Sequence, residues 1–390
     1  MTEFDYILVG GGLQSGLLAL ALRERKPSAR IALIEASDRI GGNHTWSFHS
    51  GDVPPAANTI IQPLITAHWP QYDTRFPNQS RRLNAAYSTI SSDRFADVVS
   101  ASLNRDGCRI WLKTPAVRLT HNRIECADGT ELSAKCVIDS RGPLESPTGC
   151  GYQKFIGWEI ETDRDWPESA PVVMDATVPQ IDGFHFFYTL PFTKRRILVE
   201  DTYFSDSPQL DRPQIEQRIR DYLSARVPDW RIIREESGVL PMPWRSHPNS
   251  LPETPSETPP ETPSDAPIRG GYAGGWFHPA TGYSFPVALR FALAVADVSP
   301  ELARNAIATL ARRLTHRWKF ARLLNRLLFC LVPPESRWQV FARLYRTLPP
   351  AVFARFYSME FAVTDAARIL IGRPPQINFL RLLPFSRSQR

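Results

Sequence analysis

The N-terminal segment alternates apolar runs and turns in a regular order. Residues 6–9 form a short apolar run, residues 10–12 are three glycines, and a leucine- and alanine-rich stretch follows with helical spacing. Residues 31–34 form a second apolar run that ends on Glu35. This order predicts a strand, a turn, a helix and a parallel strand, which is the βαβ unit that binds dinucleotides.

The glycines and the acid of this unit have separate physical tasks. Gly10 allows the tight turn, and Gly12 lets backbone N–H groups approach a pyrophosphate at the helix N-terminus. Glu35 can accept hydrogen bonds from a ribose diol. Ser15 stands where a third glycine is usual, and serine is small enough for close helix–strand packing. An ordinary α/β turn without a ligand is the alternative. The candidate cofactor-binding residues here are Gly10, Gly11, Gly12, Gly16 and Glu35.

The middle of the chain is rich in predicted strands. Within residues 85–150, three strands in a meander are expected at residues 109–112, 116–119 and 123–126. An apolar strand then begins at Cys136 and runs through Asp139 into a glycine turn at Gly142. Residues 151–250 alternate aromatic, apolar and polar positions, which predicts a β-rich substrate domain. A hairpin is expected there from residues 183–192 and 195–204.

The last third of the chain begins with a change in composition. Residues 251–267 repeat a Glu-Thr-Pro unit, and because proline blocks helix and sheet, they predict a disordered or polyproline-like surface insertion. Residues 268–298 start with a glycine-rich loop, after which Ser284 and Pro286 predict a helix start. From about Pro300 onward the apolar spacing is helical.

Length and cysteine usage narrow the class of protein. The 390 residues, 43% of them hydrophobic, are enough for two or three domains. Five scattered cysteines without CxxC spacing argue against a disulfide framework or a metal site and for a reducing compartment. The acidic N-terminus leads directly into the first strand, so no signal peptide is expected. No apolar run is long enough to span a bilayer.

The net charge of +6 is unevenly distributed. Residues 301–390 carry 16 Lys and Arg against 4 acidic residues, a net charge of +12, so residues 1–300 carry about −6. Arginines alternate with Trp, Phe, Leu and Tyr, which favours contact of residues 299–390 with an anionic membrane surface. A helical domain with solvated arginines is the alternative, and no nucleic-acid-binding module is recognisable. We expect a cytoplasmic protein peripherally associated with the inner membrane.

Three separated segments resemble the nucleotide domain of the glutathione-reductase-like FAD flavoproteins. They are residues 1–50, 85–150 and 268–298, and the resemblance implies an α/β fold with a discontinuous FAD-binding Rossmann domain. The late helix would point its positive N-terminal end at the flavin and stabilise negative charge on the reduced ring. FAD is therefore expected rather than free NAD. The further candidate cofactor-binding residues are Gly41, Gly42, Asp139, Gly142, Gly282, Tyr283 and Ser284.

Three motifs narrow the resemblance. They are GNHTWSFH from Gly42, ILVEDTY around Glu200 and FHPATGYS around His278, and together they resemble the bacterial lycopene β-cyclases along the whole chain. The resemblance implies closure of the linear ends of lycopene into β-rings, giving β-carotene through γ-carotene. It also implies reduced FAD with NAD(P)H as the reductant, no net redox change, and other carotenoid-pathway enzymes as partners.

The residue chemistry fits this reaction. Ring closure starts with protonation of an alkene, which needs a positioned acid in an apolar pocket, and burial raises the pKa of a carboxyl group. Glu200 and Asp201 lie on an apolar strand, and because neighbours face opposite sides, only one can reach a given pocket. The sequence leaves open which of the two side chains reaches the pocket, and the resemblance assigns the role of proton donor to Glu200. Without the resemblance, two adjacent acidic residues on a strand are more often a surface salt-bridge site.

The steps after protonation have weaker candidate residues. His278 could accept the final proton, although a lone histidine is more often structural. Aromatic faces could stabilise the carbocation, although most are more often core residues. The candidates are Phe184, Phe186, Phe187, Tyr188, Trp276, Phe277 and Tyr283. Two other functions stay open: an FAD-dependent monooxygenase or prenyl reductase of the same fold, and a non-catalytic flavoprotein or membrane scaffold that needs no acid.

Overall fold

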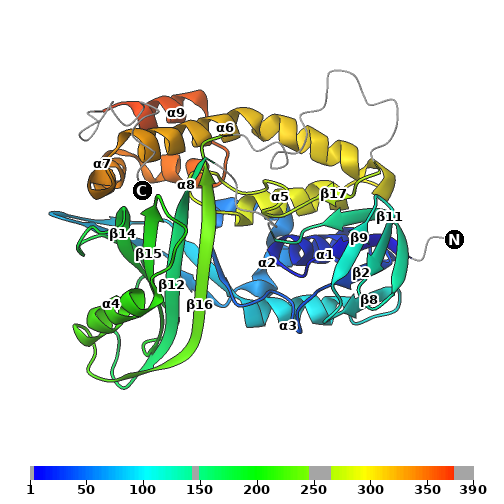
Figure 1. Ribbon diagram of the computed structural model, residues 1–390, viewed down its shortest axis with the longest axis horizontal. Helices are drawn as coiled ribbons and strands as arrows, with labels where there is room; N and C mark the ends of the chain where they lie inside the picture. The colour runs from blue at the N-terminus through cyan, green and yellow to red at the C-terminus, as the bar shows by residue number, and fades with distance from the viewer. Residues whose placement is uncertain (1–3, 143–148, 246–264, 373–390) are drawn as a thin grey trace.

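The structure is a computed structural model that describes residues 4–142, 149–245 and 265–372. The strands of these residues form two seven-stranded sheets and one three-stranded sheet. Figure 1 shows the two large sheets at opposite ends of the molecule, with the long helix α6 running above both.

The first large sheet contains the predicted βαβ unit. Its parallel strands, in spatial order, are β8 (Cys108–Trp111), β2 (Ile31–Ile34), β1 (Phe4–Val9), β11 (Glu131–Asp139) and β17 (Ile268–Arg269). The helices α1 (Leu13–Arg25), α3 (Ser92–Leu103) and α5 (Phe285–Ala296) pack together beside it. Strands from the beginning, middle and late parts of the chain therefore share one sheet.

The expected meander is only partly as predicted. The strands β9 (Ala116–Leu119) and β10 (Arg123–Cys126) do pair antiparallel with each other and with β11. The strand expected at residues 109–112 does not join them: β8 pairs parallel with β2 instead. The reason is that α3 precedes β8 and forms a crossover, which returns the chain parallel to the sheet.

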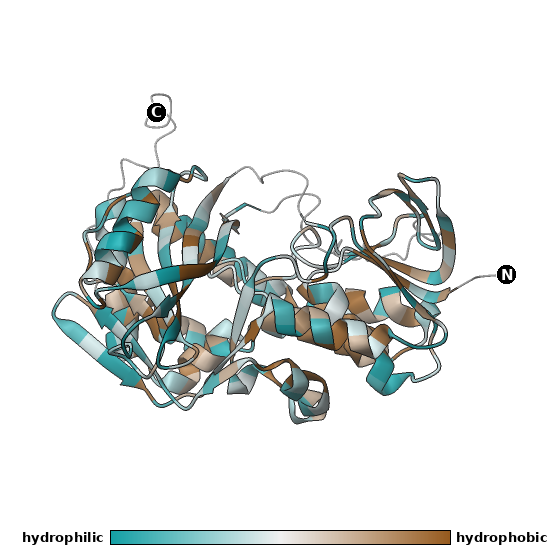
Figure 2. Ribbon diagram, turned by 90° about the horizontal axis from the view of Figure 1, so that it is seen from below, coloured by the Kyte–Doolittle hydropathy of each residue, from teal (hydrophilic) through white to brown (hydrophobic). Residues whose placement is uncertain are grey.

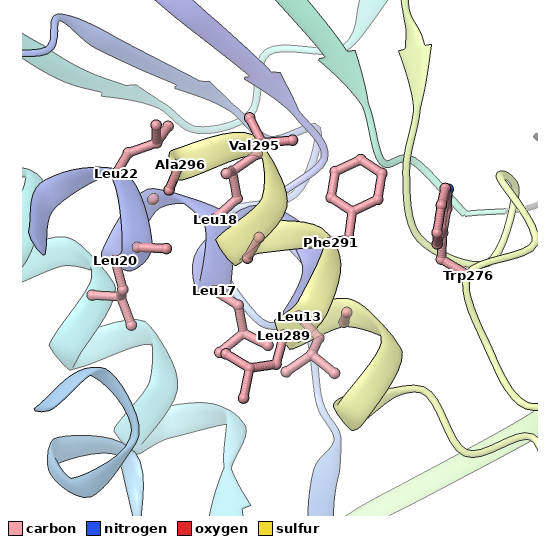
Figure 3. Packing of buried hydrophobic residues seen from close by; sticks show 14 of the residues in the cluster. Leu13, Leu17, Leu18, Leu20, Leu22, Trp276, Leu289, Phe291, Val295 and Ala296 are labelled. Atoms are coloured by element: carbon pink, nitrogen blue, oxygen red, sulfur yellow. The ribbon is translucent and has the colours of Figure 1, made fainter. Parts of the chain in front are cut away.

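The helices α1 and α5 form the centre of the core beside this sheet. Leu17 and Leu18 of α1 and Leu289 of α5 are fully buried, and Figure 3 shows them meeting between the two helices. Phe291 packs edge-on against Trp276 with ring centroids 4.9 Å apart. Burial of each such side chain stabilises the fold by about 1.5–3 kcal/mol, so the last segment of the nucleotide-binding part is firmly attached to the first.

The second large sheet contains the predicted hairpin, since β14 (Phe184–Pro191) and β15 (Arg196–Ser205) pair antiparallel. The sheet order is β16 (Trp230–Pro243), β12 (Cys150–Thr162), β15, β14, β13 (Val172–Asp175), β5 (Tyr72–Phe76) and β6 (Gln79–Leu83). Helix α4 (Arg212–Ser224), which lies inside the segment predicted to be β-rich, covers one face. Strands β5 and β6 come from a region that the sequence pattern left unassigned.

Small elements connect the two large sheets. The three-stranded sheet consists of β3 (Thr45–His49), β7 (Tyr87–Ser91) and β4 (Ala67–Trp69). Between β3 and β4 lie short helical turns at Ser50–Asp52, Pro55–Ala57, Asn58–Ile61 and Gln62–Leu64. Figure 2 shows hydrophobic residues gathered on the strands and inward helix faces, and hydrophilic residues on the outer hairpins.

The C-terminal part is helical, as predicted, as far as Leu370. It contains α6 (Ala303–Leu331), α7 (Arg337–Thr347), α8 (Pro350–Tyr357) and α9 (Val363–Leu370), preceded by single turns at Pro300–Leu302 and Pro334–Ser336. No helix among the described residues is long and apolar enough to cross a bilayer. The Glu-Thr-Pro repeats, up to residue 264, and the last 18 residues of the predicted helical region lie outside the described residues.

Candidate functional site

The glycine turn after β1 leaves room for a phosphate group. Gly10 has a φ of +90°, and a Cβ atom there would lie 2.9 Å from the carbonyl oxygen of Ser140. A Cβ atom at Gly12 would meet no other atom within 4 Å, so the space at the N-terminus of α1 is open. A turn that needs glycine at its first position and leaves backbone N–H groups accessible fits a dinucleotide pyrophosphate.

The acid at the end of β2 is held in place by its neighbours. The backbone N–H of Gly11 donates to Glu35 Oε2 over 2.5 Å, and the backbone N–H and Oγ of Ser37 donate to Glu35 Oε1 over 2.7 Å and 2.8 Å. Glu35 is half-buried and keeps acceptor capacity for a ribose hydroxyl. These residues therefore fit the adenosine end of FAD.

Two of the candidate cofactor residues have other contacts. A Cβ atom at Gly16 would lie 2.1 Å from Cζ of Phe95, so this glycine lets α1 approach α3. Asp139 forms a two-point ion pair with Arg141, with Nε–Oδ1 at 2.8 Å and Nη2–Oδ2 at 2.9 Å. We infer that Gly16 serves the packing of two helices and that Asp139 holds Arg141, and that neither residue touches a cofactor.

A cavity of about 580 Å³ extends from this turn to the second large sheet. It brings together most of the residues predicted from the two ends of the chain and from the middle. The predicted residues that line it are Gly10, Gly12, Gly41, Gly42, Gly142, Glu200, Gly282, Tyr283 and Ser284. The predicted residues that do not line it are Gly11, Gly16, Glu35, Asp139, Asp201 and His278.

The N-terminus of α5 opens into the same cavity. Ser284 is the N-cap residue, and both Ser284 and Phe285 line the cavity. The preceding Tyr283 is held by its hydroxyl, which donates to Asp52 Oδ2 over 2.5 Å. The partial positive charge of a helix N-terminus therefore faces the cavity, as the sequence predicted for a flavin site.

Glu200 meets a second carboxyl group across an intervening strand. It lies on β15 beside Gly157 of β12, and Gly157 lies beside Glu236 of β16. A Cβ atom at Gly157 would lie 2.6 Å from Cγ of Glu200 and 3.3 Å from Cγ of Glu236. The missing side chain at Gly157 thus leaves the space in which the two carboxyl groups hydrogen-bond to each other.

This environment raises the pKa of Glu200. Burial raises the pKa of Glu200 well above its usual range, and the charge of Glu236 and their shared hydrogen bond raise it further. The positive charge of Arg234 lowers the pKa of Glu200 with a smaller effect. Arg234 Nη1 donates to Glu236 Oε2 over 2.7 Å. Glu236 also accepts a hydrogen bond from Thr45 Oγ1 over 2.8 Å. The site therefore favours the protonated form of Glu200, whose carboxyl group faces the cavity.

Aromatic side chains form much of the wall of this cavity. Tyr188 lies beside Glu200 on β14, and its hydroxyl donates to Ser47 Oγ over 2.8 Å and lies 3.0 Å from the Tyr87 hydroxyl. The other aromatic residues of the wall are Trp46, Tyr72, Phe155, Phe186, Phe204, Tyr272, Trp276, Tyr283, Phe285, Phe341, Tyr345 and Tyr357. The cavity thus presents a buried acid and aromatic faces to an apolar ligand.

Asp201 lies on the opposite face of the second sheet. Its carboxylate is fully buried and accepts hydrogen bonds from Tyr203 Oη over 2.5 Å and Arg218 Nε over 3.1 Å, and it also contacts His185 Nε2. Arg218 belongs to α4, so this cluster fastens the helix to the sheet. The strand alternation expected from the sequence thus separates Glu200 from Asp201, and we give Asp201 a structural role.

His278 is also buried outside the cavity. Its Nδ1 accepts a hydrogen bond from the backbone N–H of Ala280 over 3.1 Å, and its ring packs edge-on against Phe356. Burial lowers the pKa of His278 to about 3, so the imidazole is neutral. Its contacts are those of a residue that shapes the glycine-rich loop before α5.

Sequence reasoning missed three polar residues of the site. Glu236 had a usable signal, because Glu235 and Glu236 form a second acidic pair within the segment predicted to be β-rich. His49 lines the cavity, and its Nδ1 lies 3.7 Å from Oδ2 of the buried Asp52. His49 ends the GNHTWSFH motif, but Asp52 follows in a short turn that no sequence pattern marked.

The parallel dinucleotide sheet, the β-meander and the antiparallel sheet across the cavity define a glutathione-reductase-like FAD flavoprotein fold. The family model described as lycopene cyclase protein matches residues 5–382, and the chain belongs to the lycopene cyclase family. Lycopene β-cyclases from Pantoea ananas and Pseudescherichia vulneris are 38% and 39% identical to it. These matches cover 96% and 95% of this chain and 95% and 94% of the relatives.

The fold is shared more widely than the family. The crystal structure of p-nitrophenol 4-monooxygenase from Pseudomonas putida aligns with a TM-score of 0.62 at 13% identity. The alignment covers 96% of this chain and all of that chain. At this identity the likeness concerns the fold, and the reaction has to be argued from the site.

Proposed function

We propose that this chain closes the linear end groups of lycopene into β-rings, giving β-carotene through the monocyclic γ-carotene, without net oxidation or reduction. The observation that carries the proposal is the position of Glu200, a buried acid with a raised pKa in the same cavity as the dinucleotide turn. Oxygen transfer to a substrate needs no such acid, whereas protonation of an alkene does. Reduction of an alkene would also take up a proton, but it would oxidise one flavin for each double bond, whereas ring closure would not.

The residues that would hold FAD come from the first and the last of the three segments of the nucleotide-binding part. Gly10, Gly11 and Gly12 would bind the pyrophosphate, Glu35 the ribose, and the α5 N-terminus at Ser284 the flavin end. In its reduced form, which NAD(P)H would generate, the flavin supplies negative charge that stabilises a nearby carbocation. The protein residues carry out the proton transfers.

Glu200 donates a proton to the terminal double bond of the bound end group, which leaves a tertiary carbocation. The next double bond along the chain attacks this cation, so that the new carbon–carbon bond closes the ring and the positive charge moves to a ring carbon. Aromatic faces such as those of Tyr188 and Phe186 stabilise the charge without trapping it. Loss of a neighbouring proton then leaves the ring double bond.

His49 is positioned to accept that final proton. It lines the cavity, and its ring contacts Tyr87 and Tyr357 at centroid distances of 5.0 Å and 5.4 Å. Asp52, 3.7 Å from its Nδ1, would stabilise the imidazolium that forms. The proton returns to Glu200 through solvent, and the overall reaction is an isomerisation.

An anaerobic assay on lycopene in liposomes with chemically reduced FAD tests this function. We expect a dicyclic product of unchanged mass and no oxidised flavin. A product of altered mass, or one flavin oxidised per turnover, would contradict the cyclase and support the second candidate, a monooxygenase or reductase, which the monooxygenase fold favours.

Placing a methyl group in the turn tests the cofactor site. Because a Cβ atom at Gly12 meets only open space, Gly12→Ala is expected to fold normally but to block the phosphate. We expect flavin affinity to fall about tenfold or more, equivalent to about 1.4 kcal/mol, with the melting temperature of the flavin-free protein unchanged. Flavin fluorescence titration measures the first quantity, and unchanged affinity would contradict the assignment.

We also propose that the C-terminal helices bind an anionic membrane surface in the cytoplasm. Arg326 of α6 and Arg346 of α7 are exposed beside half-buried leucines of the same helices. Each arginine near a lipid surface contributes about 1 kcal/mol, so Arg326→Gln with Arg346→Gln is expected to weaken binding to anionic vesicles about fivefold per residue. The same proposal includes contacts between this chain and other carotenoid-pathway enzymes on that membrane surface.

The matched control for this pair replaces Arg118 and Arg164 with glutamine. Their side chains are 83% and 76% exposed and lie on β9 and on the loop after β12, away from the C-terminal helices. Vesicle sedimentation at low and high salt should show a salt-dependent loss of vesicle binding for the Arg326→Gln and Arg346→Gln variant alone. Equal losses in both pairs would mean that only net charge matters and would contradict a specific membrane face.

A further inference from the structure

A second cavity of about 200 Å³ lies among the C-terminal helices. Leu324, Leu327 and Leu331 of α6 and Val340 and Leu344 of α7 form two apolar sides of it. The remaining apolar wall comes from α8, α9 and the start of the loop after α7. The lining is therefore chiefly hydrocarbon.

Two polar side chains of this wall, Asn325 and Arg343, donate to backbone carbonyl groups of the protein. The amide of Asn325 donates to the carbonyl oxygens of Pro243 and Pro279, over 3.0 Å and 2.7 Å. The guanidinium of Arg343 donates to the carbonyl oxygen of Ile369 over 2.8 Å and to that of Ile371. A polar ligand would lose its water contacts in this cavity, whereas a hydrocarbon gains about 25 cal/mol for each Å² buried.

The second cavity adjoins the first. Thr281, Phe341, Tyr345 and Tyr357 line both, so a single layer of side chains separates them. The hydroxyl groups of Tyr345 and Tyr357 lie 3.0 Å apart, and these two rings form part of that layer. A chain bound in the first cavity therefore has an apolar continuation past two tyrosines.

The outer end of the second cavity is accessible. Leu370 of α9 lines it and is 46% exposed, and Leu327 and Leu344 are half-buried. The exposed Arg326 and Arg346 neighbour these leucines in α6 and α7. Apolar side chains flanked by arginines are the surface that enters a lipid headgroup region.

We propose that this second cavity holds the polyene chain beyond the reacting end group and that the substrate enters through it from the bilayer. The proposal rests on the proposed cyclase function and adds the path of the uncyclised chain. The first cavity has to hold the flavin ring and one end group beside Glu200, so the rest of a long linear polyene needs a separate apolar route. The second cavity supplies it.

Filling the second cavity tests the proposal. Leu344→Trp and Leu327→Trp place bulk in its lumen, whereas Leu323→Trp places the same ring on the outside of α6, where Leu323 is 43% exposed. Each variant is assayed with lycopene and with a truncated apocarotenoid that has one linear end group and a chain too short to pass Tyr345. We expect kcat/KM for lycopene to fall about tenfold or more in the two filling variants only. The truncated substrate should be cyclised at the wild-type rate by all three.

A binding measurement separates this proposal from the proposed function. Lycopene retained by the flavin-free protein on gel filtration in detergent should decrease in both filling variants and not in Leu323→Trp. Unchanged lycopene turnover and binding would overturn the cavity assignment, and so would equal losses with both substrates in both filling variants. If wild type cyclises neither substrate yet binds lycopene in the expected pattern, the cyclase function fails and the polyene-binding site stands.

Discussion

Glu200→Gln is expected to lower the rate of ring closure by a factor of about 10²–10⁴, which is the usual contribution of a positioned general acid. Glutamine keeps the shape and hydrogen-bonding capacity of the side chain but cannot release a proton to an alkene. Flavin binding should be unchanged, because Glu200 lies on β15 of the second sheet and the dinucleotide turn belongs to the first. Chromatography of the carotenoid products measures the rate, and flavin titration measures binding.

The control for this variant is Glu161→Gln on the neighbouring strand β12, where the side chain is 45% exposed and pairs with Arg231. It should cyclise lycopene at the wild-type rate. If Glu200→Gln retained wild-type activity, the proton donor would lie elsewhere and the proposed mechanism would be wrong. If flavin affinity fell together with the rate, the loss could not be attributed to proton transfer.

The same proton gives Glu200 a defined effect on stability. The pKa of Glu200 is raised in the folded protein, so protonation favours the folded state at low pH. This contribution is complete below the ordinary glutamate pKa and is lost as the pH rises through the raised one. Denaturant titrations of Glu200→Gln should therefore lack this part of the decline in unfolding free energy with rising pH.

Glu236→Gln is expected to move the pH dependence of the reaction to lower pH. Activity requires protonated Glu200, so it is present below the pKa of Glu200 and is lost as the pH rises through it. The variant removes the neighbouring negative charge, which is the second largest cause of the raised pKa, while burial remains. Each unit by which the pKa falls lowers the rate about tenfold at a fixed pH above it.

Initial rates across the pH range in which the variant is folded measure this shift. Glu235→Gln is the matched control, because Glu235 is the adjacent residue on β16 and accepts a hydrogen bond from Trp158 Nε1 on the other side of the sheet. Its pH profile should equal that of the wild type. A profile of Glu236→Gln that keeps its wild-type position but loses amplitude would mean that Glu236 supports the fold rather than the proton on Glu200.

The part of the site that could be predicted from sequence is the part made by local geometry. The turn at Gly10 and Gly12 and the acid at Glu35 lie within one βαβ unit, whose strand and helix periods and glycine spacing are written in consecutive residues. The β14–β15 hairpin and the start of α5 at Ser284 were predictable for the same reason. The predicted strand alternation also required Glu200 and Asp201 to face opposite sides.

What the sequence could not decide was which partners these elements would meet. Glu236 acquires its importance only because β16 and β15 pair with opposite edges of β12 at Gly157, which brings together carboxyl groups 36 positions apart in the chain. The placement of β8 beside β2 depended on the crossover through α3, and the removal of His278 from the cavity depended on packing against α8. Gly16 resembled a phosphate contact, but the Phe95 ring on α3 accounts for its missing side chain.

The sequence by itself therefore determined the dinucleotide-binding unit, the alternation that separates Glu200 from Asp201, and the family. The tertiary structure alone decided that Glu200 faces the cavity with Glu236 as its partner, and that an apolar space among the C-terminal helices adjoins that cavity. The physical reason is the distance along the sequence over which each effect acts. Backbone periodicity and turn chemistry act over a few consecutive residues. The pKa values and the cavities depend on contacts between strands and helices that are distant in the chain.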